Sequence, residues 1–152
     1  MENKLKAVTI LLRATKSMEK VLKKDISTYG LNTTEFGVLE YLYHKGPQPM
    51  QNLCKRLLMA NSSMTYVIDN LVKNDYVERY SDEVDKRSIY VKLTASGLDY
   101  IKEIFPVHEK RIEEVLSVLT DTELISLTET LKKIGYYSEK ISKEGKLNKW
   151  NS

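Results

Sequence analysis

Apolar residues recur at helical spacing in the N-terminal part of the chain. Between residues 4 and 28 they form one stripe, and Lys and Glu fill the opposite face. The pattern predicts an amphipathic helix that ends at Tyr29-Gly30, where glycine can take the left-handed conformation of a helix stop. The stripe comprises Leu5, Val8, Leu11, Leu12, Thr15, Met18, Leu22 and Ile26.

A second helix begins at a capping box. Asn32 is followed three residues later by Glu35, and Leu31 and Phe36 occupy the two hydrophobic-staple positions around this cap. The helix is expected to stop near His44-Lys45-Gly46, ahead of Pro47.

Two further helices are expected before residue 75. Pro49 can open the third helix, because its missing N–H is harmless in a first turn. A tight turn at residues 59–61 leads into a fourth helix from Asn61 to Asn74. The predicted buried sides are Met50, Leu53, Cys54, Leu57 and Leu58 in the third helix, and Met64, Val67, Ile68, Leu71 and Val72 in the fourth.

The hydrophobic period then changes from 3.6 to 2. Residues 76–80 and 89–93 each alternate as strands do, with Ile89, Val91 and Leu93 expected to face inward. The polar segment between them is too long for a two-residue turn, so the pair predicts a hairpin with an extended tip.

Two longer helices complete the pattern. Thr94 can cap a helix over residues 95–119 that is bent by Pro106, and the segment Thr120–Glu123 can cap another that runs to about Lys143. A polar tail is expected over residues 144–152. The stripe of the first of these helices is Leu98, Ile101, Ile104, Phe105, His108, Ile112, Val115, Leu116 and Leu119.

Composition narrows the possible functions. The chain has 152 residues, a net charge of +3 and one cysteine. No stretch is apolar enough to cross a bilayer and no signal peptide is evident, which favours a cytoplasmic protein. Neither a multi-cysteine metal site nor a zinc spacing is present, so no metal and no cofactor is expected. The mild positive charge permits nucleic-acid binding but does not argue for it.

The order helix–helix–helix–hairpin is that of a winged helix-turn-helix, which makes the chain mainly α in an α+β class. In such a fold the first turn of the second helix of the motif meets base edges in the major groove. That turn carries short hydroxyl and amide groups on Asn61, Ser62, Ser63 and Thr65, followed by Tyr66. These five residues are the predicted major-groove contacts.

The hairpin tip carries Asp85, Lys86 and Arg87. An arginine at the tip of a wing can enter the adjacent minor groove, where the potential is strongly negative if the groove is narrow. Asp85 could hold the Arg87 guanidinium by a forked pair. These three residues are the predicted wing contacts.

The chain resembles the MarR family of transcription regulators. The matching segments lie in order and at family spacing: 31–36 with 38–39, 53–57, 62–65 with 68–71, 77–79, 85–87 and 93–97. The resemblance implies DNA contacts at Ser62, Ser63, Thr65, Tyr66 and Arg87. It also implies a homodimer built from the first, fifth and sixth helices, with half-sites of a palindrome about 10 bp apart.

Three positions depart from the family pattern. Ala60 stands where a Ser or Thr usually opens the recognition helix, so Asn61 is expected to shift into the capping role. Pro49 replaces a common Thr, and Ser96 replaces a common Lys.

The predicted elements form a single domain with two parts. The winged-helix lobe is expected to cover residues 32–93, and residues 1–30 and 94–143 are expected to form the dimerisation region.

Cys54 and the two histidines are each interpreted as structural residues rather than as functional ones. Cys54 is interpreted as a small buried hydrophobe, and thiol sensing beside Lys55 and Arg56 is the alternative. His44 and His108 are interpreted as helix-end and interface residues rather than as ligands. A faint likeness to quinone- and phenol-responsive relatives suggests a small aromatic or quinone-like effector.

These observations predict a DNA-binding transcription regulator. We expect a repressor that binds a palindromic operator as a homodimer and is released by a small molecule or an oxidant. An enzyme is not expected, since the chain lacks a phosphate loop, a nucleophile elbow and a clear acid–base pair. The alternative is a winged-helix module that binds proteins and no longer touches DNA.

Overall fold

The computed structural model describes the backbone of residues 1–148 and the side chains of residues 1–144. The chain divides into two compact units at the bond between Ile112 and Glu113.

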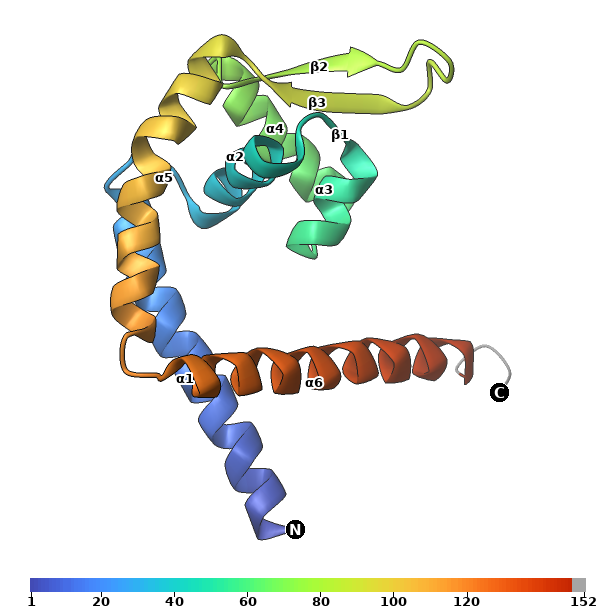
Figure 1. Cartoon of the computed structure of the whole chain (residues 1–152). Helices are drawn as coiled ribbons and strands as arrows, with labels where there is room; N and C mark the ends of the chain where they lie inside the picture. The colour runs from blue at the N-terminus through green and yellow to red at the C-terminus, as the bar shows by residue number, and fades with distance from the viewer. Residues whose placement is uncertain (149–152) are drawn as a thin grey trace. The chain divides into compact units, whose positions relative to one another are not determined.

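Eight helices and strands begin in the first unit, and one more helix begins in the second (Figure 1). The first unit contains α1 (Glu2–Ser27), α2 (Thr33–Lys45), β1 (Gln48–Pro49), α3 (Met50–Leu57), α4 (Asn61–Lys73), β2 (Val77–Ser81), β3 (Ile89–Leu93) and most of α5 (Ala95–Leu116). The second unit contains the end of α5 and all of α6 (Asp121–Asn148).

The predicted capping box at the start of α2 is confirmed. The backbone N–H of Glu35 donates to Asn32 Oδ1 at 2.8 Å, and the N–H of Asn32 donates to Glu35 Oε2 at 3.0 Å. Gly30 and Gly46 both have a φ of 73° at the turns on either side of α2. These local signals therefore define α2 at both ends.

The sheet has a third strand that the sequence pattern did not reveal. Its order is β1-β3-β2, all antiparallel, with Gln48 opposite Val91 and Pro49 opposite Tyr90. Pro49 is therefore an extended residue before α3 (ψ 148°) rather than the first residue of that helix. Proline is tolerated here because β1 is an edge strand. The β2–β3 hairpin extends beyond α2, α3 and α4 (Figure 1).

One core unites α2, α3, α4, the sheet and the first half of α5. Its central side chains are fully shielded from solvent, and Ile101 and Ile104 of α5 close it. The core comprises Ile26, Leu31, Phe36, Val38, Leu39, Leu42, Leu53, Met64, Val67, Ile68, Leu71, Val77, Val91, Ile101 and Ile104. This core holds α4 and the wing in fixed positions relative to one another.

Three side chains predicted to be buried are exposed. Leu58 is 93% exposed because it follows the last turn of α3 in the left-handed conformation (φ 52°), which directs its side chain away from the core. Val72 is 40% exposed near the end of α4, and Ile89 is 37% exposed at the first position of β3. Each lies at the end of an element, where periodicity no longer determines burial.

In the second unit α6 starts at a capping box, as predicted. The N–H of Thr120 donates to Glu123 Oε2 at 2.8 Å, and the N–H of Glu123 donates to Thr120 Oγ1 at 3.3 Å. α5 ends at Leu116, short of the predicted residue 119, and α6 continues past the predicted end at Lys143 to Asn148. The predicted polar tail thus begins as helix, and its residues 149–152 lie outside the described part of the chain.

Candidate DNA-binding surface

The first turn of α4 presents the predicted polar groups to solvent. Asn61, Ser62, Ser63, Thr65 and Tyr66 are all exposed, and the Tyr66 side chain is 69% exposed. Between them the fully buried Met64 anchors the turn in the core. The helix therefore projects five potential contacts from a rigid base.

Asn61 does not cap α4, contrary to expectation. Ala60 is the N-cap residue in extended conformation (ψ 155°) and has no side-chain oxygen, so Asn61 is the first helical residue. Its carbonyl accepts the Thr65 hydroxyl at 2.9 Å, and its side-chain Oδ1 accepts the thiol of Cys54 at 3.1 Å. Cys54 is thus half-buried, with its sulfur directed at the recognition helix.

The wing tip is organised by Asp85. One carboxylate oxygen accepts the backbone N–H of Arg87 at 3.1 Å, and the other accepts the Ser88 hydroxyl at 3.3 Å. The Arg87 side chain is 96% exposed and contacts Asp85 through Nε alone, at 3.5 Å. Asp85 therefore stabilises the loop through its hydrogen bonds to Arg87 N–H and to Ser88. Its contact with the Arg87 guanidinium is not the forked pair that the sequence suggested.

A contact that the sequence did not predict joins the wing to the recognition helix. Arg79 in β2 donates to Asp69 Oδ1 at 2.6 Å and to the carbonyl of Thr65 at 3.2 Å. Both residues lie in segments that carry the family resemblance, but their pairing across 10 positions has no local signal. This bond ties the orientation of α4 to that of the hairpin.

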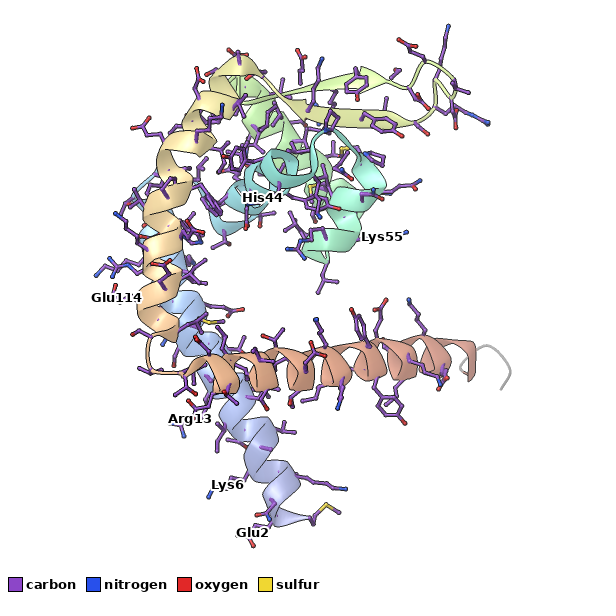
Figure 2. All side chains as sticks on the ribbon, in the orientation of Figure 1. Glu2, Lys6, Arg13, His44, Lys55 and Glu114 are labelled. Carbon is purple, nitrogen blue, oxygen red and sulfur yellow. The ribbon has the colours of Figure 1, made fainter. Side chains whose placement is uncertain are left out.

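The wing and the first turn of α4 border one cleft. Its volume is about 280 Å³, and its lining includes Asn61 and Thr65 from α4, Arg87 from the wing and Gln51 from α3. Of the eight predicted contacts, Asn61, Thr65 and Arg87 therefore face a common space, and the other five do not line it. Lys55 extends from α3 into solvent (Figure 2).

A second, larger cavity lies among α1, α2 and α5 within the first unit. Its volume is about 590 Å³, and apolar side chains including Leu22, Ile26, Phe36 and Ile112 form much of its lining. Glu19, Lys23, Glu40 and His108 add polar groups. Sequence reasoning did not find this cavity, because its walls come from segments far apart in the chain.

His108 belongs to a buried polar cluster beside that cavity. Its Nδ1 lies 2.8 Å from Asp25 Oδ2, and the two side chains are only 6% and 9% exposed. The same carboxylate accepts the Tyr29 hydroxyl at 3.0 Å and lies 3.7 Å from Arg111 Nε. Burial, followed by the hydrogen bond to Asp25, raises the pKa of Tyr29 to about 12.

The two histidines therefore differ from one another. His108 packs on Phe36, with ring centroids 4.4 Å apart, so it is a core residue of the first unit rather than the expected interface residue. His44 lies in the last turn of α2 (Figure 2), as expected of a helix-end residue. Its ring centroid is 4.9 Å from that of Phe105.

The described residues offer neither a metal site nor a membrane-spanning helix. No group of three or more His, Cys, Asp or Glu side chains there could hold a metal ion. Within the same residues, no helix combines the length and the apolarity needed to cross a membrane.

Comparison with known proteins decides the family. The profile described as "MarR family" matches residues 31–89. The HTH-type transcriptional regulator MhqR of Bacillus subtilis (strain 168) is 40% identical over 134 residues, which cover 88% of this chain and 92% of that protein. The chain belongs to the MarR family. It is a transcription regulator and not an enzyme.

Solved structures of MarR-family proteins have the same fold. AbsC of Streptomyces coelicolor matches with a TM-score of 0.85 at 21% identity, over 91% of this chain and 96% of that one. A mutant of MarR from E. coli, complexed with operator DNA, matches with a TM-score of 0.76 at 25% identity, over 88% and 97%. The MarR-family fold thus extends over most of the present chain.

Proposed function

We propose that this regulator is a repressor that binds a palindromic operator as a homodimer and is released by a small aromatic effector. The observation that carries the proposal is the shared cleft, which the exposed first turn of α4 and the Arg87-tipped wing both border. That arrangement suits a helix in the major groove and an arginine in the neighbouring minor groove. The E. coli MarR structure with operator DNA supports the same use of the fold.

The contacts we assign are Asn61, Ser62, Ser63, Thr65 and Tyr66 for the major groove, and Asp85, Lys86 and Arg87 for the wing. Asp85 acts by shaping the loop, since its two oxygens hold Arg87 and Ser88. Residues 32–93 form the DNA-binding lobe, and residues 1–30 and 94–143 form the dimerisation region of one domain.

Exposed apolar side chains support dimerisation. α1 exposes Leu5, Val8 and Leu12 by more than half, and α6 exposes Ile125 by 67% and Ile141 by 50%. Side chains of this kind, repeated along a helix, are costly to leave in water.

Sedimentation equilibrium tests the dimer and should give twice the chain mass at micromolar concentration. Leu5→Glu combined with Val8→Glu should give the monomer, and Lys6→Glu on the same helix is the matched control.

The cavity beside Phe36 is the proposed effector site. Its volume lies in the range of small-molecule sites, and an aromatic ring could pack against Leu22 and Ile112 while a hydroxyl donates to Glu40. Gly37 borders the cavity and also faces Leu57 of α3, so a ligand that moves α2 would move the helix-turn-helix. Thiol sensing through Cys54 is the alternative route of release.

Selection of bound duplexes from random DNA by the purified protein tests the first part. A palindrome with half-sites about 10 bp apart is expected. Failure to enrich any sequence would favour the protein-binding alternative.

Titration of the protein–operator complex with hydroquinone, and with benzoquinone as a thiol-reactive probe, tests the second part. Release that Glu40→Gln weakens and Cys54→Ser leaves intact supports the cavity. Release that only Cys54→Ser abolishes would instead make the thiol the sensor.

A further inference from the structure

Cys54 and Asn61 form a contact across the turn between the two helices of the helix-turn-helix. The Cys54 thiol donates to Asn61 Oδ1 at 3.1 Å. The backbone carbonyl of Cys54 accepts the N–H of Met59 at 3.0 Å and also the N–H of Leu58, the C-cap residue of α3. One residue of α3 thus holds both the turn backbone and the first side chain of the recognition helix.

The contact determines how the Asn61 amide is turned. Because Oδ1 faces α3, the amide presents its Nδ2 group on the other side. In the described part of the chain, that group donates no hydrogen bond. Asn61 is exposed and borders the cleft with Thr65 and Arg87, whereas Cys54 is half-buried behind it. The side of the residue available to a ligand is therefore its donor side.

We infer that Cys54 is a positioning residue for DNA reading, which orients Asn61 so that it presents N–H donors to the operator. This inference rests on the proposed function. An asparagine free to turn pairs with adenine through both its oxygen and its nitrogen. With Oδ1 held by the thiol, Asn61 instead selects an acceptor, such as guanine O6 or N7 or thymine O4.

The physical basis is rotamer restriction. An exposed asparagine samples both orientations of its amide, which differ in whether the oxygen or the nitrogen faces outward. A thiol offers an S–H to the oxygen, and serine offers a stronger O–H donor at the same position. Alanine at residue 54 removes the donor and leaves the amide free to turn.

The experiment compares Cys54→Ala with Cys54→Ser by duplex selection and by affinity for the selected operator and its single-base variants. Cys54→Ala should relax the preference at the base read by the first turn of α4 by about fivefold per half-site, as expected for loss of one net hydrogen bond. The salt slope should stay unchanged, because no phosphate contact is lost. Cys54→Ser should retain the wild-type preference.

Two further variants keep the test decisive. Asn61→Asp retains an acceptor for the thiol but lacks the Nδ2 donors, so it should lose the same preference with residue 54 intact. In an Asn61→Ala background, Cys54→Ala should have no further effect on base preference. An effect that persists there would mean that Cys54 acts through packing, and it would overturn the inference.

Other outcomes are equally distinct. Full base preference in Cys54→Ala, or the same relaxed preference in Cys54→Ser, would overturn the positioning role while leaving the DNA-binding proposal standing. A wild-type protein that selects no sequence would remove the DNA-binding proposal and this role with it. The side-chain amide NMR signals of Asn61 report the contact without DNA: they should show a rigid amide in wild type and Cys54→Ser, and an averaged one in Cys54→Ala.

Discussion

Gly97 occupies a position in α5 where the structure leaves no room for a side chain. A Cβ built there would lie 1.9 Å from the carbonyl oxygen of Tyr76 and 2.7 Å from its carbonyl carbon. Contacts between carbon and a carbonyl oxygen are about 3.3–3.6 Å, so the two backbones would have to separate by about 1.5 Å. Thr94, three residues earlier in the chain, donates its N–H to the same Tyr76 oxygen at 3.1 Å.

The substitution Gly97→Ala should therefore be strongly destabilising. Forcing a methyl group into a packed site costs about 1–3 kcal/mol, and loss of the Thr94–Tyr76 hydrogen bond adds about 1 kcal/mol. A total near 3 kcal/mol corresponds to a fall in Tm of about 6–12 °C for a chain of this size. Because Tyr76 leads directly into β2, the displacement should also weaken operator binding.

The same change at Gly135 is the matched control. Gly135 lies within α6, and an added Cβ there meets no atom within 4 Å. Alanine is the better helix former by about 0.5–1 kcal/mol, so Gly135→Ala should raise Tm slightly. Differential scanning calorimetry of both variants measures the pair. An unchanged Tm in Gly97→Ala would refute the close backbone approach between α5 and Tyr76.

Three further predictions address the wing, the turn and the buried cluster. Arg87→Ala should lower the slope of log affinity against log salt by about one unit per wing without changing Tm, as measured by fluorescence anisotropy; an unchanged slope would exclude Arg87 from phosphate contact. Leu58→Gly should stabilise the protein to urea by up to about 1 kcal/mol, since it removes a side chain from a left-handed residue, and a loss would contradict that geometry. Because the pKa of Tyr29 is raised to about 12, above the ordinary value of 10.0, its contribution to stability is complete below pH 10 and is lost as pH rises to 12. Tyr29→Phe should flatten that decline in urea titrations and remove one phenolate that forms above pH 10 from the absorbance at 295 nm. An unaltered decline would assign it to other groups.

Local signals in the sequence were sufficient to predict most elements. The capping box at Asn32 and Glu35 needs only residues three apart, and the buried faces of α2 and α4 follow from helical spacing. β1 was missed because two residues cannot show a period. Leu58 was misplaced because a left-handed residue ends the helical geometry on which its predicted burial depended.

The candidate sites divide in the same way. The first turn of α4 and the wing tip are each continuous in sequence, so their residues could be predicted without the structure. The pair of Asp25 and His108 is separated by 83 positions, and neither residue belongs to a motif. The pair forms where Asp25, near the end of α1, meets His108 of α5, and that meeting depends on the folded first unit rather than on the pattern of either helix. The contact of Arg79 with Asp69 has the same origin.

The apolar stripe of α1 is largely exposed in the single chain. Its spacing is that of a helix buried along one side, yet in the single chain only Ile26 of this stripe is buried, and Leu5, Val8 and Leu12 are more than half exposed. A hydrophobic period cannot distinguish a helix that packs within its own chain from one that packs against a second copy. Residues of α1 that belong to the apolar stripe but are exposed in the single chain mark a surface that an assembly would cover. The proposed dimer interface therefore lies on the part of α1 that the single chain leaves exposed.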